Sequence, residues 1–187
     1  MDPLAPQHHD LDSLRAAAGS GARLKYLFFW GHTAAHPTDI GKECLSQWYS
    51  AKFVLDGLQF PTAEHYMMFR KATLFHDDAA ARDILSAPNP AAAKALGRSV
   101  RGFQEATWQE HRLSIAVDAN YAKFSQSPPL LQFLLNTKGR VLVEASPVDR
   151  IWGIGLAVDD PHVDNPLEWR GLNLLGFALM DVRERLR

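Results

Sequence analysis

The chain has 187 residues, 47% of them hydrophobic, and its 20 lysines and arginines against 21 aspartates and glutamates leave a formal net charge of −1 at pH 7. This length predicts a single domain whose core is large enough to fold without a metal or disulfide framework. The balanced charge argues against a broad phosphate-binding surface, and no apolar run approaches the roughly 20 residues that would span a bilayer.

The first 22 residues are rich in Ala, Gly, Ser, His and Asp and have few apolar anchors. They predict a partly disordered N-terminal tail with a short helix around Asp12–Ala18, followed by one domain over residues 23–187. Met1–Gly21 lacks the basic and apolar stretches of a signal peptide. We therefore expect a soluble, cytoplasmic protein in which the single Cys44 is a small buried residue.

Two early segments have the composition of β-strands. Lys25–Trp30 (KYLFFW) is a short aromatic-rich run closed by Gly31, which favours a buried strand. Ala51–Phe60 has two β-rich runs on either side of Asp56-Gly57, the dipeptide that best tolerates the positive φ angles of a tight hairpin turn. A strand followed by a β-hairpin is therefore expected.

The middle of the chain is predicted to be helical from its capping residues and apolar spacing. The expected helices span Ala63–Phe75 after an N-cap at Thr62, Asp77 or Asp78 to Ser86, Asn89–Gly97 with a first-turn proline and a terminal glycine, Glu105–Phe124, and Ser127–Leu135. Arg140–Glu144 (RVLVE) predicts another strand. A final helix is indicated by an apolar stripe at steps of three and four, made by Leu172, Leu175, Leu179, Val182 and Leu186.

Glu64 and Lys71 stand seven residues apart in the sequence TAEHYMMFRKA. Seven residues make nearly two α-helical turns, so both side chains emerge on one face, about 10 Å apart along the axis at ~1.5 Å per residue. That separation is too long for an ion pair, but two long side chains can converge on one substrate across it. The alternative is that Glu64 only complements the helix dipole and Lys71 is solvated.

A second group of polar residues and glycines follows the predicted strand that ends at Glu144. Ser146-Pro147 turns the chain, and Asp149 precedes Trp152 and the glycines of Gly153-Ile154-Gly155. Such glycines either let a ligand approach the backbone closely or only form a turn. Long irregular segments of this kind inside a compact domain are more often functional than idle.

Three tryptophans, Trp30, Trp152 and Trp169, each lie beside a glycine near the end of a regular element, where a stacking platform would be built. Each one taken singly is more typical of a core residue. Gly171–Asn173 leads into the last helix, whose first backbone amides are a natural site for phosphate or hydroxyl groups.

No metal site is expected. His32 and His36 are spaced i,i+4, but Gly31 and Pro37 flank a segment too short and polar for a helix, and no third ligand is suggested. The sequence also contains no Gly-rich phosphate loop and no nucleophile elbow. We therefore expect no cofactor.

Seven longer motifs follow one another along the chain: FFWG (Phe28–Gly31), LSQWY (Leu45–Tyr49), FPTAEHYMMFRKA (Phe60–Ala72), LGR (Leu96–Arg98), KF (Lys123-Phe124), LVEASPVDRIWGIGL (Leu142–Leu156) and WRGLNLLGFALMDVRERL (Trp169–Leu186). In this order they resemble the NADAR or YbiA-like family, over roughly residues 25–187. The resemblance implies a compact, mainly helical α+β fold. With the elements above, we expect a small β-sheet or hairpin packed among about six or seven helices.

The same resemblance implies an enzyme linked to NAD and ADP-ribose metabolism that hydrolyses N-glycosidic bonds to ribose. Family substrates are early riboflavin-pathway intermediates or ADP-ribose attached to guanine. This chain has Trp152-Gly153-Ile154-Gly155 where riboflavin-associated members resemble WGDG, and a longer connection at Leu156–Trp169. Both departures favour an ADP-ribosyl substrate.

Breaking a ribosylamine bond requires an acid for the leaving nitrogen and a group that acts at C1. Glu64 is expected to do the acid–base work, with Asp149 as a second carboxylate that orients water or stabilises positive charge. Lys71 either attacks the opened sugar as a Schiff base, if burial lowers its pKa, or binds a phosphate or hydroxyl as a cation. The expected substrate-binding residues are Trp30, Gly31, Trp48, Arg98, Ser146, Trp152, Gly153, Trp169, Gly171 and Asn173.

Two alternatives to ADP-ribose removal stay open: an N-glycosidase of riboflavin intermediates, and a non-catalytic ADP-ribose or NAD-binding module. The expected partners are ADP-ribose or a ribosylamine ligand, with ADP-ribosylated nucleic acid as a further one and no membrane. A monomer or weak homo-oligomer is expected.

Overall fold

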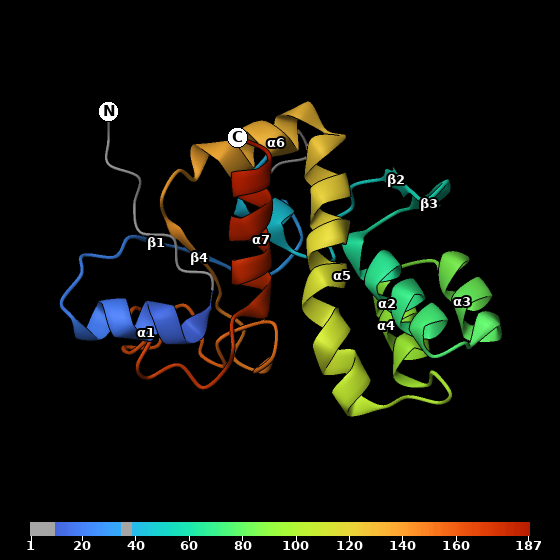
Figure 1. The fold of residues 1–187 in the computed structure, drawn as a ribbon. Coiled ribbons are helices and arrows are strands. Elements are labelled where there is room, and N and C mark those ends of the chain that lie inside the picture. Colours follow the sequence, from blue (N-terminus) through green and yellow to red (C-terminus); the bar gives the residue numbers. More distant parts are fainter. Residues whose placement is uncertain (1–9, 35–38) are drawn as a thin grey trace.

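The fold is mainly helical with two small sheets, as expected from the sequence (Figure 1). The computed structural model describes residues 10–34 and 39–187. Within them the elements are α1 (Leu11–Gly19), β1 (Tyr26–Phe29), the 3₁₀ helix η1 (Lys42–Leu45), β2 (Phe53–Leu55), β3 (Leu58–Phe60), α2 (Ala63–Leu74), α3 (Asp78–Leu85), α4 (Pro90–Arg98), α5 (Glu105–Ser125), α6 (Pro128–Asn136), β4 (Val141–Glu144) and α7 (Leu174–Arg185). Among these described helices, none has the length and apolar character needed to cross a bilayer.

The helices divide around α5, which lies beside α7 in the middle of the molecule (Figure 1). Helices α2, α3 and α4 pack on one another, and α2 also packs on α5. On the other side, β4 packs against α7 and pairs with β1. The core is continuous through both halves, and Cys44 belongs to it as predicted. Burial raises the pKa of its thiol to about 12.

Strands β1 and β4 form a parallel pair, in register from Tyr26 opposite Val141 to Phe29 opposite Glu144. Parallel pairing brings the carboxyl ends of both strands to one edge of the sheet. The segments that leave this edge begin with Trp30 and Ala145. Residues more than a hundred positions apart in the sequence therefore meet there, and this edge carries the candidate site.

Local signals in the sequence are confirmed where caps and turns are concerned. The side chains of Thr62, Asp77 and Asn89 each accept a hydrogen bond from a backbone N–H in the first turn of α2, α3 and α4, respectively. The hairpin of β2 and β3 turns at Asp56 and Gly57, both with positive φ, as a tight primed turn requires. These elements form because their sequence determinants are contiguous.

The predicted N-terminal tail is partly helical. Helix α1 matches the expected short helix, with Leu14 buried in the core. Arg15 ties it to the 146–169 segment by donating to the carbonyls of Pro166 and Trp169, at 3.1 and 3.2 Å. Residues 1–9 and His36 lie outside the described residues, so the partly disordered tail and the expectation that His32 and His36 hold no metal both stay predictions.

Two details of the helices differ from the expectation. Gly97 does not terminate its helix but lies inside α4, where a Cβ would collide with the side chain of Met68. Gly97 is therefore needed for close packing of α2 on α4 rather than for a helix end.

Leu172 precedes α7 and is 42% exposed, so the apolar stripe of this helix begins at Leu175.

Gly176→Ala is expected to lower the free energy of unfolding by about 1–3 kcal/mol, the usual cost of overpacking a core. A Cβ at Gly176 would collide with the backbone carbonyl of Leu142 and with the Asn173 side chain, neither of which can swing away. Urea denaturation measures the change. Gly19→Ala is the matched control, because a Cβ there meets nothing within 4 Å; equal stability of the two variants would contradict the proposed packing.

Candidate active site

Glu64 lies at the centre of the candidate site, in the first turn of α2. Its side chain is 5% exposed. Its backbone N–H donates to the carbonyl of Gln47 at 3.0 Å, and the indole N–H of Trp48 donates to its carboxyl group. Two neighbouring residues thus hold Glu64 by its backbone and by its side chain.

The pKa of Glu64 is raised from 4.5 to about 7, mainly because burial disfavours the carboxylate. The nearby charges of Lys94 and Arg98 and the Trp48 hydrogen bond lower it, while the charge of Asp149 raises it further. Glu64 is therefore substantially protonated near neutral pH. A buried carboxyl in this state is suited to donate a proton to a leaving group.

Glu144, at the end of β4, is a half-buried residue that brings a second carboxyl to the same site. Burial and the charges of Asp149 and Glu64 raise its pKa to about 8, and Lys94 partly offsets them. Its Oε2 atom is buried and has no hydrogen-bond partner among the described residues. Glu144 was not among the expected site residues. The signal in the sequence that could have indicated it is an acidic residue at the end of an otherwise apolar strand.

Asp149 is the third carboxyl, and its local backbone holds it in place. Its Oδ1 accepts from the backbone N–H groups of Ile151 and Trp152, both at 2.8 Å, and its own N–H donates to Ser146 Oγ at 3.1 Å. Asp149 thereby closes the turn after β4. Ser146, expected to bind substrate, is buried and shapes this turn.

Lys71 lies at the other end of the same face of α2. Its Nζ is 4.2 Å from the ring centroid of Phe103 and 5.6 Å from that of Trp108. Burial lowers its pKa, and the charge of Glu105 partly offsets this. Glu64 stands in the first turn of α2 and Lys71 in its last turn, so the two residues lie toward opposite ends of the helix.

Lys94 and Arg98, one turn apart on α4, are the cations that act on Glu64. Arg98 was expected at the site, and Lys94 was not. The Nζ of Lys94 also lies 5.7 Å from the ring centroid of Trp48. Because α4 packs on α2, these two cations reach the end of α2 that carries Glu64.

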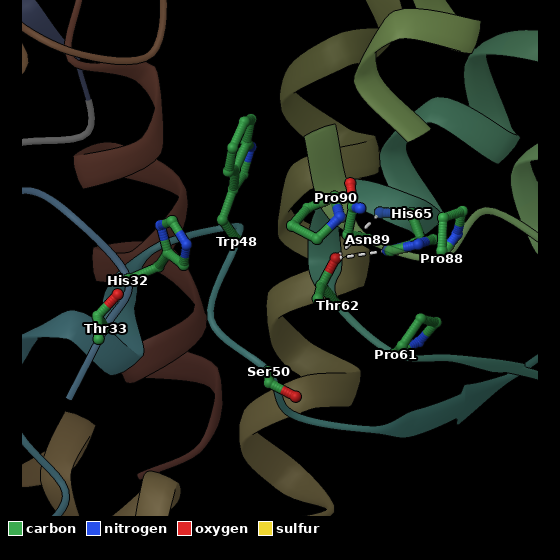
Figure 2. A pocket seen from close by; sticks show the side chains of 10 residues that line it. All are labelled: His32, Thr33, Trp48, Ser50, Pro61, Thr62, His65, Pro88, Asn89 and Pro90. Carbon is green, nitrogen blue, oxygen red and sulfur yellow. Dashed lines mark hydrogen bonds between the residues drawn. The ribbon is translucent and has the colours of Figure 1, made fainter. Parts of the chain in front are cut away.

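Trp48 lines a pocket of about 350 Å³ (Figure 2) and also donates a hydrogen bond to Glu64 of the charged cluster. On one side of the pocket are His32 and Thr33, which follow β1; the 88–90 segment that opens α4 is on the other (Figure 2). The rings of Trp48 and His32 are 5.5 Å apart between centroids. The lining residues are His32, Thr33, Trp48, Ser50, Pro61, Thr62, His65, Pro88, Asn89 and Pro90.

Two expected substrate-binding residues instead bond to the chain itself. Asn173 is 0% exposed; its Oδ1 accepts from the N–H of Glu144 and its Nδ2 donates to the carbonyl of Leu142. Trp169 is buried, and its indole N–H donates to the carbonyl of Val163 at 2.8 Å. The polar atoms of both side chains thus bond to the protein itself, and their substrate-binding role stays a prediction.

Two expected glycines likewise serve packing. A Cβ on Gly153 or Gly171 would collide with neighbouring backbone, so each permits the close passage of two segments. Trp30 is 59% exposed and Gly31 has a φ of +84°, while Trp152 is half-buried. Trp30, Gly31 and Trp152 stay predictions as substrate-binding residues. Within the described residues, no group of three or more His, Cys, Asp or Glu is placed to hold a metal ion.

Helix α5 positions the segment that carries Trp48. Lys123 is 1% exposed and its Nζ donates to the carbonyl of Ser46 at 2.8 Å. Asn120 Nδ2 donates to Gln47 Oε1 at 2.9 Å. Two buried polar side chains of α5 therefore anchor the residues immediately before Trp48.

Lys123 is expected to make stability depend on pH. Burial lowers its pKa to about 7, so between pH 7 and its unfolded value the unfolded chain binds more protons and stability rises with pH. Between pH 7 and 8.5 wild type should gain about 1–2 kcal/mol that Lys123→Met does not gain. Urea denaturation at both pH values measures this, with the exposed Lys52→Met as control; the same gain in Lys123→Met would contradict it.

Comparison with known proteins places the chain among N-glycosidases. The family profile described as the NADAR domain matches residues 28–187. The chain is 41% identical over 165 residues to N-glycosidase R617 of Acanthamoeba polyphaga mimivirus, covering 86% of this chain and 95% of that protein. It is 37% identical over 139 residues to the chloroplastic riboflavin biosynthesis protein PYRR of Zea mays, covering 70% of this chain and 20% of that protein.

The fold is also similar to a solved structure. The NMR structure of the E. coli protein YbiA superposes with a TM-score of 0.69 at 27% identity, covering 87% of this chain and 84% of that chain. That protein is named N-glycosidase YbiA.

Proposed function

The chain belongs to the NADAR family and is an N-glycosidase, and we propose that it removes ADP-ribose from the nitrogen of a base. The observation that carries the proposal is the buried carboxyl of Glu64, whose pKa is raised to about 7 in a site that also holds Asp149 and Glu144. Acid–base pairs of this kind suit glycosidic bond cleavage, because one group must give a proton while another handles water.

In the proposed reaction the bond between C1 and the base nitrogen breaks with its electron pair going to nitrogen. Glu64 gives the nitrogen a proton, and Asp149 stabilises the positive charge that develops at the ribose. Water then forms the new bond to C1 and passes its proton to the site carboxylates. The hydrolysis needs no further reactant.

Lys71 has two candidate roles in this scheme. Its lowered pKa supports a neutral amine that attacks C1 of the ring-opened, base-linked iminium. The bond from C1 to the base nitrogen then breaks, the base leaves with its electron pair and a proton, and water hydrolyses the resulting Schiff base to free the lysine and the sugar. In the other role it stays a cation and binds a phosphate or hydroxyl oxygen. Its place in the last turn of α2, with Glu64 in the first, suits a substrate that spans both ends of this helix face.

Two observations favour ADP-ribose as the group removed. Lys94 and Arg98 on α4 give two cations beside Glu64, suited to the diphosphate. Ile154, at the position where riboflavin-associated members resemble an acidic residue, is buried in the core. At position 154 this chain therefore has a side chain that packs in the core instead of an acidic one.

A riboflavin-pathway ribosylamine is the second candidate substrate, favoured by the identity to the maize riboflavin biosynthesis protein. A product assay with guanine-linked ADP-ribose beside this ribosylamine tests the proposal. Release of ADP-ribose is expected from the first. Hydrolysis of the ribosylamine alone would overturn the choice of substrate, and tight ADP-ribose binding in calorimetry without turnover of either would indicate a non-catalytic module.

A further inference from the structure

We propose that the pocket between His32–Thr33 and Pro88–Pro90 is the subsite for the leaving base, a planar, uncharged heteroaromatic ring stacked on Trp48 (Figure 2). The inference rests on the proposed function, because it assigns one half of the cleaved substrate to a place in the site. It adds that the leaving base stacks on the residue that hydrogen-bonds to Glu64.

The size of the pocket fits one half of such a substrate. Ligand pockets range over roughly 300–1,000 Å³, and this one measures about 350 Å³. That volume suits a single ring system rather than a base together with an ADP-ribosyl group. The ribose and diphosphate must then lie outside it.

The lining favours an aromatic ring over a phosphate. Its described lining residues include no lysine, arginine, aspartate or glutamate, and their apolar surfaces are Trp48 and the prolines at 61, 88 and 90. The Trp48 indole and the His32 imidazole, 5.5 Å apart, provide two aromatic rings at its mouth. Stacking on aromatic side chains tolerates any base, since every base has a π-face.

His65 does not add a positive charge to the pocket. Its Nε2 lies 3.1 Å from the carbonyl of Ala87, which can only accept, so Nε2 carries the proton. Its Nδ1 then accepts from Thr62 Oγ1 at 2.7 Å. Burial also lowers its pKa, so the ring is neutral and its polar atoms are already bonded.

The position of Trp48 links the pocket to the chemistry. Its indole N–H donates to Glu64, while its ring lines the pocket. A base stacked on this ring would present its glycosidic nitrogen beside the acid that protonates it. The cations Lys94 and Arg98, which do not line the pocket, act on Glu64 from α4 and are left for the diphosphate.

Calorimetry with two separate probes, guanosine and ADP-ribose, tests the assignment. Ser50→Trp places a large side chain in the pocket and should weaken guanosine binding about tenfold or more while leaving ADP-ribose affinity within about twofold. His32→Ala, which fills nothing and removes one ring, should weaken guanosine binding severalfold. Ser114→Trp, on the exposed surface of α5, is the matched control and should change neither affinity.

Three outcomes would overturn the subsite: wild-type protein that does not bind guanosine, pocket variants that bind it unchanged, or equal loss of both probes in His32→Ala. Hydrolysis of N-linked ADP-ribose by wild type is measured independently. If the wild type does not hydrolyse this substrate but the pocket variants still weaken guanosine binding, the proposed function is wrong and the subsite assignment stands. If the wild type hydrolyses the substrate normally but the pocket variants bind guanosine as well as the wild type does, only the subsite assignment is wrong.

Discussion

Glu64→Gln is expected to lower kcat by about 10²- to 10⁴-fold, the usual contribution of a positioned general acid. The glutamine amide matches the shape of the protonated carboxyl but has no acidic proton to give. Because the pKa of Glu64 is about 7, its buried position already holds the neutral carboxyl in much of the wild-type protein at neutral pH, and the fold should tolerate the change. Steady-state release of free ADP-ribose measures the loss, and circular dichroism checks folding. Glu110→Gln, on the exposed side of α5, is the control that should keep wild-type turnover.

The pH profile gives Glu64 a separate test. A general acid is active when protonated, so activity should fall as pH rises through about 7, the pKa of Glu64. Because Glu144 has a pKa of about 8 and the two groups interact, the falling limb belongs to the pair. The residual activity of Glu64→Gln should lack the lower part of this limb. An unchanged limb in that variant would assign the acid role to another group.

The parts of this fold that could be predicted are those whose determinants are contiguous. The cap of α2 at Thr62 and the turn at Asp56-Gly57 depend on residues within a few positions, so local pattern sufficed. The role of Gly97 depends on Met68 in another helix, and no local pattern contains that contact. The position of Gly97 near the end of a predicted helix instead suggested that it terminates this helix.

The site was predictable in part for the same reason. Glu64 stands in the first turn of a predicted helix, and Asp149 in a turn beside glycines, so each was visible as a polar residue in a special place. Glu144 and Lys94 join them only through the parallel pairing of β1 with β4 and the packing of α4 on α2. The place of Asn173 at a helix start predicted a ligand contact, but no local pattern indicated the bonds to β4 that hold its side chain in the core.

Two features of the surroundings of Lys71 are unusual for a lysine that is only solvated. Its ammonium lies over Phe103 and near Trp108, and burial lowers its pKa. Desolvation favours the neutral amine that a Schiff base requires, whereas the aromatic rings and Glu105 favour the cation. The two effects oppose each other, so a substitution that keeps the charge but removes the amine separates the roles.

Lys71→Ala is expected to lower kcat by about 10³-fold or more if the amine is the nucleophile, on the scale of losing a covalent catalyst. Lys71→Arg then loses as much, because guanidinium keeps the charge but cannot form the Schiff base. If Lys71 acts only as a cation, Lys71→Arg retains most of the activity. Borohydride added during turnover should leave a reduced sugar adduct on Lys71 of the wild type, found by peptide mass mapping. Active turnover with no adduct, together with an active Lys71→Arg, would establish the cationic role and remove the covalent step.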